Sequence, residues 1–270
     1  MMEQLSRQSF LGVDSERIFE ANKIGVIGLS GGGSHVVQQS AHIGVGHYVV
    51  IDPKVMEHKH LHRIVGATGD DVRQSLPKAN ISERVIKGIR PHADVQAYVA
   101  NWQEKQMFLR DCTAIFGCVD SYSEREQIER FCRRFLIPFI DIGMDVFSTS
   151  AASFHICGQT VLSGPGHPCL RCMGIVTEKR LEDEAATYGV AGPKPQVVWP
   201  NAILASAAIG LFVQLVSPWH PLSSACAYLE YNGNVPFLHP SPRMEYAATM
   251  HCEHFRIDEV GDPFFSLPAK

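Results

Sequence analysis

Short apolar runs alternate with helix-like periodicity along the first half of the chain. Residues 24–29 form an apolar run that breaks into glycines, residues 35–43 have helical character, and a second apolar run ends on Asp52. Further strands are predicted at 95–99, 114–119 and 139–142, and further helices at 76–89, 103–109 and 123–135. This alternation predicts βαβ units, and therefore an α/β, Rossmann-like, mostly parallel sheet with helices on both faces.

The pattern changes after residue 145. Residues 150–162 predict a hairpin around Gly158, and another strand is predicted at 228–231. Residues 173–196 are charged and are expected to form an irregular connection, whereas the nearly all-apolar residues 202–216 predict a buried helix. The antiparallel strands of this half are expected to continue the parallel sheet of the first half.

The glycines after the first apolar run predict a nucleotide-binding turn. Gly28, Gly31, Gly32 and Gly33 let the backbone approach phosphate oxygens, and the helix that follows directs its first N–H groups at an anion. Asp52 lies roughly 20 residues further on, where a carboxylate can accept hydrogen bonds from ribose hydroxyls. A tight turn without a ligand is the alternative interpretation. These residues leave open which nucleotide binds.

Charged residues near the predicted strand ends extend this site. Arg63 closes a polar, histidine-rich segment that is expected to be a loop beside the nucleotide, and its side chain could reach phosphate. Lys78 lies at the start of a helix, where the helix dipole disfavours a cation unless an anion is bound nearby. Asp120 follows the fourth strand as Asp52 follows the second, so both could face one crevice, although Asp120 could instead cap the next helix.

Cysteines in the second half indicate a metal site. Cys169 and Cys172 form a C-x2-C pair in a loop rich in glycine and proline, which is typical of half a zinc knuckle. The other two ligands are expected near the C-terminus, either Cys252 with His254 or His251 with His254. Two thiols without a metal are the alternative. The expected fold therefore includes a zinc-knuckle loop after the antiparallel strands.

Length and composition exclude several classes of protein. A chain of 270 residues can form one large domain, and its net charge of −4 gives no reason to expect a nucleic-acid surface. The first eight residues lack the apolar core of a secretory signal, and residues 202–216 are too few to span a bilayer comfortably. We expect a cytoplasmic protein with no membrane or nucleic-acid partner, whose eight cysteines are reduced thiols or metal ligands.

The motifs and their order along the chain resemble those of the bacterial ThiF/MoeB/HesA group, relatives of the ubiquitin-activating enzymes. The resemblance extends over almost the whole length of the chain. The segments that carry the resemblance are the Arg-Gln leader at 6–12, the glycine turn at 28–34, the run from Asp52 to Arg63, the Pro-Lys-Ala helix start at 77–79, Cys-Val-Asp-Ser at 118–121 with Arg125, and the C-x2-C pair. The resemblance implies a single adenylation domain over 1–270. Its nucleotide-binding half would be 1–145 and its carrier-binding and zinc half 146–270.

The resemblance also implies an activity, in which ATP adenylates a carboxylate and pyrophosphate is released. The carboxylate would be the C-terminal glycine of a ubiquitin-like or sulfur-carrier protein. ATP, Mg²⁺ and Zn²⁺ would be the cofactors, and the protein would be a homodimer. The implied catalytic residues are Arg63, Lys78 and Asp120, with Arg7 reaching the ATP of the partner subunit.

The implied ligand contacts follow the same motifs. The residues expected to bind ATP are Gly28, Ser30, Gly31, Gly32, Gly33, Asp52 and His60. The residues expected to bind metals are Asp120 for Mg²⁺, and Cys169, Cys172, Cys252 and His254 for Zn²⁺.

This chain departs from the family pattern at several positions. Ser30 replaces a family glycine, Lys54 replaces a common Asp, and His60 stands where an Asn contacts ATP. Restoring glycine at position 30 is expected to leave ATP binding equal or better. Residues 173–200 contain no cysteine, so adenylation without a covalent enzyme thioester is expected. The alternatives are a non-catalytic family member that binds a ubiquitin-like tail, an NAD(P)-dependent oxidoreductase, and adenylation of a peptide or small-molecule carboxylate.

Overall fold

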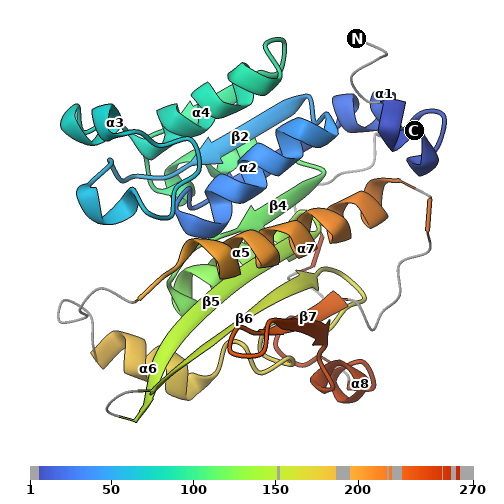
Figure 1. The fold of residues 1–270 in the computed structure, drawn as a ribbon. Helices are drawn as coiled ribbons and strands as arrows, with labels where there is room; N and C mark the ends of the chain where they lie inside the picture. The colour runs from blue at the N-terminus through green and yellow to red at the C-terminus, as the bar shows by residue number, and fades with distance from the viewer. Residues whose placement is uncertain are drawn as a thin grey trace.

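A single eight-stranded sheet organises the computed structural model, which describes residues 6–150, 153–186, 195–217, 219–220, 227–250, 252–256 and 260–261. The strand order is β3-β2-β1-β4-β5-β6-β7-β8 (Figure 1). The parallel strands are β1 (Lys23–Ile27), β2 (His47–Ile51), β3 (Asp94–Tyr98), β4 (Ala114–Gly117) and β5 (Phe139–Ser150). The antiparallel strands β6 (Ser153–Ser163), β7 (Tyr228–Asn232) and β8 (Phe237–Pro240) extend the same sheet. The predicted α/β fold class is confirmed.

Helices connect and cover the strands. The α-helices are α1 (Ser15–Ala21), α2 (Gly31–Ile43), α3 (Gly69–Arg73), α4 (Lys78–Ile89), α5 (Tyr122–Arg134), α6 (Glu178–Ala186), α7 (Val198–Val216) and α8 (Arg243–Ala247). The 3₁₀ helices are η1 (Ser6–Leu11), η2 (His58–His60) and η3 (Trp102–Leu109). Helix α7 packs against α2 and across β5 and β6, so it joins the two halves of the sheet (Figure 1).

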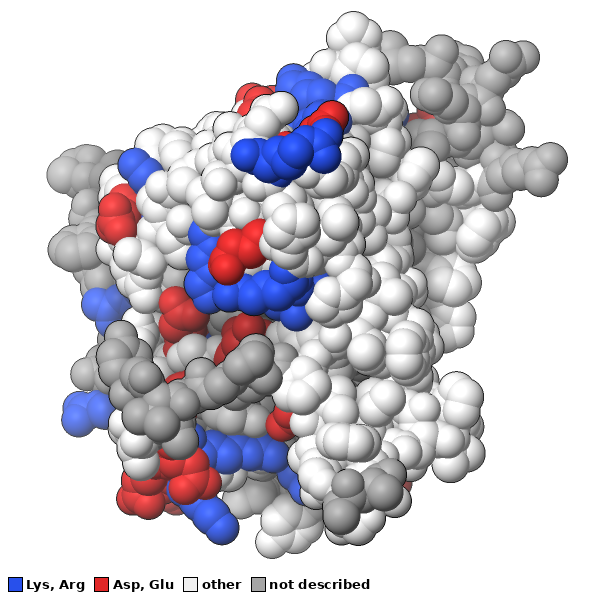
Figure 2. Space-filling view, turned by 60° about the vertical axis from the view of Figure 1, so that its left-hand side comes forward, with Lys and Arg blue, Asp and Glu red and all other residues white. Residues whose placement is uncertain are grey.

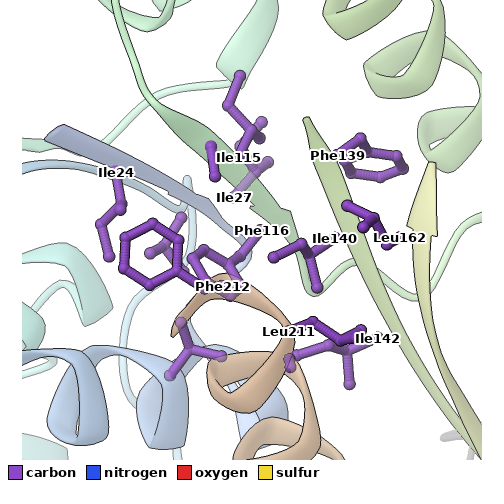
Figure 3. Close-up of a cluster of buried hydrophobic side chains, with 14 of the residues drawn as sticks. Ile24, Ile27, Ile115, Phe116, Phe139, Ile140, Ile142, Leu162, Leu211 and Phe212 are labelled. Atoms are coloured by element: carbon purple, nitrogen blue, oxygen red, sulfur yellow. The ribbon is translucent and has the colours of Figure 1, made fainter. Parts of the chain in front are cut away.

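Apolar side chains of the sheet and of α7 pack together in the hydrophobic core (Figure 3). Phe212 of α7 meets Phe116 of β4 with ring centroids 5.8 Å apart, and both are fully buried. Within the described chain, α7 is the one helix long and apolar enough to cross a membrane by length and composition, and 44% of its most apolar window is buried. Its buried side belongs to the core, as predicted for residues 202–216.

The predicted hairpin around Gly158 is wrong. Strand β6 runs straight through Gly158, which pairs with Met144 of β5, so the hairpin is formed by β5 and β6 instead. A Cβ atom at position 158 would lie 2.5 Å from Leu204 Cδ1 and 2.7 Å from the Gly143 carbonyl oxygen. Glycine is therefore needed there for close packing of α7 on the sheet, and not for a turn.

The connection predicted as irregular at 173–196 contains helix α6. None of its residues is buried, and among the described residues Leu181 is the one side chain of α6 packed, partly buried, against the hydrophobic core, so the apolar signal for a helix is weak. Polar contacts also hold this helix. Arg171 forms ion pairs with Glu178 of α6 and Glu126 of α5, and the Arg180 guanidinium lies 5.2 Å from the centroid of the Tyr122 ring.

Candidate functional site

The carboxyl ends of β1, β2 and β4 open into a pocket of about 300 Å³. Seven of the residues predicted to be catalytic or to bind ATP or its metal line this pocket: Gly28, Ser30, Asp52, His60, Arg63, Lys78 and Asp120. A smaller adjoining pocket is lined by Gly31, Gly32, Arg125 and Asn201 as well as Asp120. In Figure 2, basic and acidic side chains gather around a hollow on one face of the molecule. Of Arg7, only the backbone in η1 is described, and its side chain lies outside the described part.

The glycine turn is closely packed. Gly28 has a φ of +86°, and a Cβ atom there would lie 2.5 Å from the Cys118 carbonyl oxygen. A Cβ atom at Gly33 would lie only 1.9 Å from the Gly28 carbonyl oxygen. Helix α2 begins at Gly31, earlier than predicted, and its N-cap Ser30 makes no side-chain cap hydrogen bond. The first N–H groups of α2 thus lack this usual partner, as at helix termini that bind anions.

The carboxylate of Asp52 links the turn to the loop after β2. Asp52 is 5% exposed, and its Oδ2 accepts a hydrogen bond of 2.8 Å from the Leu29 backbone N–H. Its Oδ1 accepts a second bond of 2.8 Å from the Lys54 backbone N–H. Each carboxylate oxygen has a further lone-pair position, so both can still accept a hydrogen bond from a ligand hydroxyl.

Lys78 places a buried ammonium group at the pocket. An isolated bridge between Val55 and Pro77 and a 3.1 Å hydrogen bond from the Lys78 N–H to the Lys54 carbonyl oxygen hold the start of α4 against the loop after β2. Lys78 is 3% exposed, and its Nζ forms no hydrogen bond or ion pair with the residues that the structure describes. Burial lowers the pKa of Lys78, although the charges of Asp52 and Asp120 favour the ammonium form.

Arg63 is the second cation of the pocket. Its Nε donates a 3.3 Å hydrogen bond to Ser30 Oγ, and no carboxylate in the described ranges forms an ion pair with it. Two cations that form no ion pair with any described residue, next to an uncapped helix N-terminus, make a site suited to a polyanion.

His60 is buried, although its polar segment was expected to be a loop beside the nucleotide. It is 3% exposed, and its Nδ1 accepts a 3.2 Å hydrogen bond from the Glu57 backbone N–H. Burial first, and then the charges of Lys78 and Arg63, lowers the pKa of His60 to about 4. The ring is therefore neutral near pH 7 and carries its proton on Nε2, because Nδ1 is an acceptor.

Asp120 is exposed at the end of β4. The N-cap of α5 is Ser121, whose hydroxyl accepts a 3.1 Å hydrogen bond from the Glu124 N–H, so the helix-cap alternative for Asp120 is wrong. Gln196 Nε2 donates a 2.7 Å hydrogen bond to Asp120 Oδ1. The Gln196 carbonyl oxygen lies 3.2 Å from His62 Nε2, so Gln196 contacts both Asp120 and the segment that follows β2.

Several residues at or near these pockets were not identified from the sequence. Asn101 and Trp102 come shortly after β3 and line the larger pocket, where the strand-end rule could have found them. Gln196 and Asn201 come from the second half, and no local motif marks them. A carboxylate of α6, that of Glu184, accepts 3.0 and 2.9 Å hydrogen bonds from the first backbone N–H groups of α5.

A cysteine–histidine cluster forms the second candidate site. The ligand atoms of Cys169, Cys172, Cys252 and His254 all lie within 4.8 Å of one another. The two sulfurs of the C-x2-C pair are 3.5 Å apart, and each is 3.4 Å from His254 Nδ1. The cluster thus joins the pair with Cys252 and His254; the alternative ligand His251 lies outside the described residues. Three thiols and one imidazole are donors typical of a tetrahedral zinc site.

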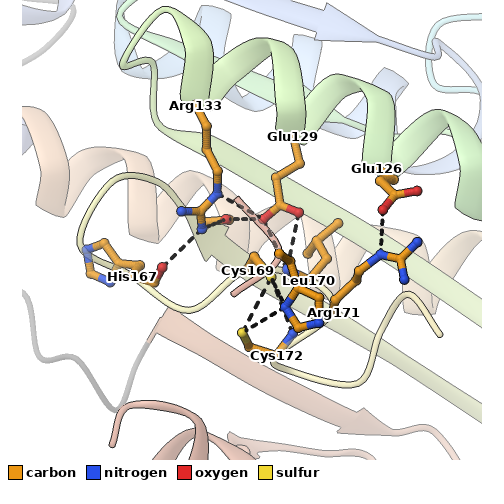
Figure 4. A network of polar contacts seen from close by, with 10 residues as sticks. Glu126, Glu129, Arg133, His167, Cys169, Leu170, Arg171 and Cys172 are labelled. Carbon is orange, nitrogen blue, oxygen red and sulfur yellow. Dashed lines mark hydrogen bonds and ion pairs between the residues drawn. The ribbon is translucent and has the colours of Figure 1, made fainter. Parts of the chain in front are cut away.

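Buried polar contacts from α5 hold the loop that carries this cluster (Figure 4). The Glu129 carboxylate accepts hydrogen bonds from the Leu170 N–H, at 3.0 Å, and from the Ser163 hydroxyl. Arg133 Nη2 donates to Ser163 Oγ at 2.8 Å and to the His167 carbonyl oxygen at 3.0 Å. Burial raises the pKa of Glu129 to about 7, while the charge of Arg133 opposes this shift.

Comparisons with known proteins identify related sequences and structures. The sequence profile of the ThiF family matches residues 2–252. The chain is 26% identical over 191 residues to the SAMP-activating enzyme E1 of Haloferax volcanii, covering 70% of this chain and 67% of that protein. It is also 26% identical over 179 residues to the sulfur carrier protein ThiS adenylyltransferase of Bacillus subtilis, covering 64% and 51%. The chain therefore spans about two thirds of the first relative and about half of the second.

Solved structures show the same fold. The E. coli MccB structure with ATP has a TM-score of 0.72 at 17% identity, covering 88% of this chain and 70% of that one. The structure of the microcin C7 biosynthetic enzyme MccB in complex with N-formylated MccA has a TM-score of 0.73 at 17% identity, covering 88% and 71%. PaaA has a TM-score of 0.68 at 16% identity, covering 88% and 81%.

Proposed function

Because the chain belongs to the ThiF family, we propose that it is an ATP-dependent adenylyltransferase, which activates a carboxylate as an acyl-adenylate and releases pyrophosphate. One observation carries the proposal. The buried ammonium of Lys78 and the guanidinium of Arg63 face one pocket together with the carboxylates of Asp52 and Asp120. An oxidoreductase that binds NAD(P) has no evident use for both cations beside the glycine turn, so they favour a triphosphate.

The proposed reaction is a transfer at the α-phosphorus of ATP. A carboxylate oxygen of the substrate forms the new bond to phosphorus, and the bond from phosphorus to the pyrophosphate oxygen breaks. The substrate is already ionised, so no general base is needed, and the protein contributes positioning and charge neutralisation. Arg63 and Lys78 neutralise charge on the phosphates and on the departing pyrophosphate, while Asp52 accepts hydrogen bonds from the ribose hydroxyls.

Asp120 is the proposed ligand of Mg²⁺. Its carboxylate is exposed at the pocket, with Glu124 also in the lining, and this fits an ion that is usually held by one or two carboxylates and substrate phosphates. When bound, Mg²⁺ would neutralise phosphate charge. The hydrogen bond from Gln196 keeps the Asp120 carboxylate oriented at the end of β4.

The proposed substrate is the C-terminal glycine carboxylate of a ubiquitin-like or sulfur-carrier protein. The names of the curated relatives support this class, because they include a SAMP-activating enzyme and adenylyltransferases of sulfur-carrier proteins. The likeness in fold to MccB, solved with MccA, makes a peptide carboxylate the second candidate. We further propose a cytoplasmic homodimer in which Arg7 of one protomer reaches the ATP of the other.

Replacing Asp120 by asparagine tests the proposed activity. ATP–pyrophosphate exchange, measured with a carrier protein ending in Gly-Gly, is expected for the wild type and should fall about 100-fold in Asp120→Asn, since one charged contact to Mg-ATP is lost. Asp94→Asn is the matched control. Asp94 is the first residue of β3 and lies at the amino end of this strand, away from the pocket at the carboxyl ends, so its replacement should change exchange less than twofold. ATP binding by the wild type without exchange for any carboxylate tested would indicate a non-catalytic family member.

The proposed zinc site is tested by its ligands. We expect one zinc per chain by elemental analysis, and Cys172→Ser should lose most of it, together with about 3 kcal/mol of unfolding free energy, because metal binding is coupled to folding. Cys157→Ser is the control, since Cys157 lies in β6 and outside the cluster, and it should retain full zinc. A zinc content unchanged by Cys172→Ser would refute the assignment.

A further inference from the structure

Ser30 occupies the N-cap position of α2 without capping the helix. Serine at an N-cap usually accepts a hydrogen bond from a backbone N–H in the first turn. Ser30 makes no such bond, and its Oγ instead accepts the 3.3 Å hydrogen bond from Arg63 Nε. The hydroxyl is therefore directed at a neighbouring cation and leaves the first N–H groups of α2 to another acceptor.

A second hydroxyl from the same turn holds the same loop. Ser34 Oγ accepts a 3.1 Å hydrogen bond from the Val65 N–H and donates a 3.0 Å bond to the Gly31 carbonyl oxygen. Ser34 thus binds the backbone of the loop, whereas Ser30 is bonded to the side chain of Arg63. The loop and the glycine turn are consequently joined on both sides of Gly32.

The choice of Nε matters for the chemistry of Arg63. A guanidinium has five N–H donors, and the bond to Ser30 uses the single donor on Nε. No described residue accepts a hydrogen bond from the four donors on the two terminal nitrogens, so these can bind an anion, and their planar arrangement suits bidentate phosphate contacts. Fixing Nε also restricts a side chain that otherwise loses much rotamer freedom when it binds a ligand.

We propose that the Ser30 hydroxyl is a positioning residue, which orients Arg63 toward the phosphates of ATP while leaving the N-terminus of α2 open to the same phosphates. The inference rests on the nucleotide-binding part of the proposed function. It gives a role to Ser30, which stands where the family has a glycine. The sequence led us to expect that Ser30→Gly leaves ATP binding equal or better. The structure leads to the opposite expectation, because glycine at position 30 removes the contact that holds Arg63.

A double-mutant cycle tests the proposal by calorimetric titration of ATP in the presence of Mg²⁺, without a carboxylate substrate. Ser30→Ala and Ser30→Gly are each expected to weaken ATP binding about five- to tenfold, which is the effect of losing one hydrogen bond of ordinary strength. Ser30→Thr retains the hydroxyl and should bind within about twofold of the wild type. In an Arg63→Lys background, Ser30→Ala should have less than about a twofold effect, because lysine has no Nε donor.

Ser206→Ala is the matched control, since the hydroxyl of this exposed serine donates to the Ala202 carbonyl oxygen of its own helix, α7, and its loss should leave ATP affinity unchanged. An equal loss in the wild-type and Arg63→Lys backgrounds would overturn the proposal, as would unchanged affinity in Ser30→Ala or no rescue by Ser30→Thr. Failure of the proposed adenylation is distinguishable. In that case the wild type binds ATP without pyrophosphate exchange, and the cycle still tests Ser30.

Discussion

Gly33→Ala is expected to lower the unfolding free energy by about 2–4 kcal/mol and to weaken ATP binding about 100-fold. The new Cβ atom would lie 1.9 Å from the Gly28 carbonyl oxygen, which belongs to the backbone and cannot rotate away as a flexible side chain could, so the turn must open for the chain to fold. An opened turn separates the start of α2 from the end of β1, and the helix N–H groups then no longer converge on one anion. Thermal denaturation and ATP titration measure the two effects.

Gly32→Ala is the matched control for stability. A Cβ atom at position 32 has Ile142 Cγ2, at 3.5 Å, as its nearest neighbour, which is an ordinary contact, and alanine favours the helix. Its melting temperature should equal or exceed that of the wild type. Equal melting temperatures for Gly32→Ala and Gly33→Ala would show that the turn tolerates a Cβ atom at position 33 beside the Gly28 carbonyl oxygen.

Lys78→Met should reduce kcat/KM for pyrophosphate exchange about 100- to 1,000-fold while raising the stability of the ligand-free protein by about 1 kcal/mol. The two effects have opposite signs because the Lys78 ammonium is buried with no partner in the described residues until an anion binds. Methionine keeps the apolar stem and removes the charge. Exchange kinetics and chemical denaturation provide the two measurements.

The difference in stability between Lys78→Met and the wild type should depend on pH, because the pKa of Lys78 is lowered in the folded wild type. Burial disfavours the ammonium in the folded state, so the stability advantage of Lys78→Met is full below the folded-state pKa. It is lost as pH rises through that value toward the ordinary lysine value of about 10.4. ATP affinity of the wild type should fall over the same range. A pH-independent stability difference would contradict this account.

The same variant tests the proposed dimer. If Arg7 acts on the ATP of the partner subunit, mixing Lys78→Met with Arg7→Ala should restore exchange, because one of the two sites in each mixed dimer has both residues intact. No recovery after subunit exchange would place Arg7 in its own subunit's site, or outside any site.

Motifs of neighbouring residues were predictable from the sequence. The glycine turn depends on residues within about one helical turn of each other, and Asp52 is brought to it by a single βαβ unit. The strand-end rule likewise placed Asp120 beside Asp52, since parallel strands bring their carboxyl ends to one edge. The C-x2-C pair was equally evident, since its spacing is local.

The sequence by itself therefore determined the α/β class, the alternation of strands and helices in the first half and the residue types of both candidate sites, because propensity, periodicity and motif spacing act over short distances along the chain. Only the tertiary structure decided that Gly158 lies within a strand, that His60 is buried, that Cys252 and His254 join the C-x2-C pair, and that Ser30 binds Arg63. Each of these depends on packing between segments distant in the chain, and the pattern along one segment does not specify its contacts with another.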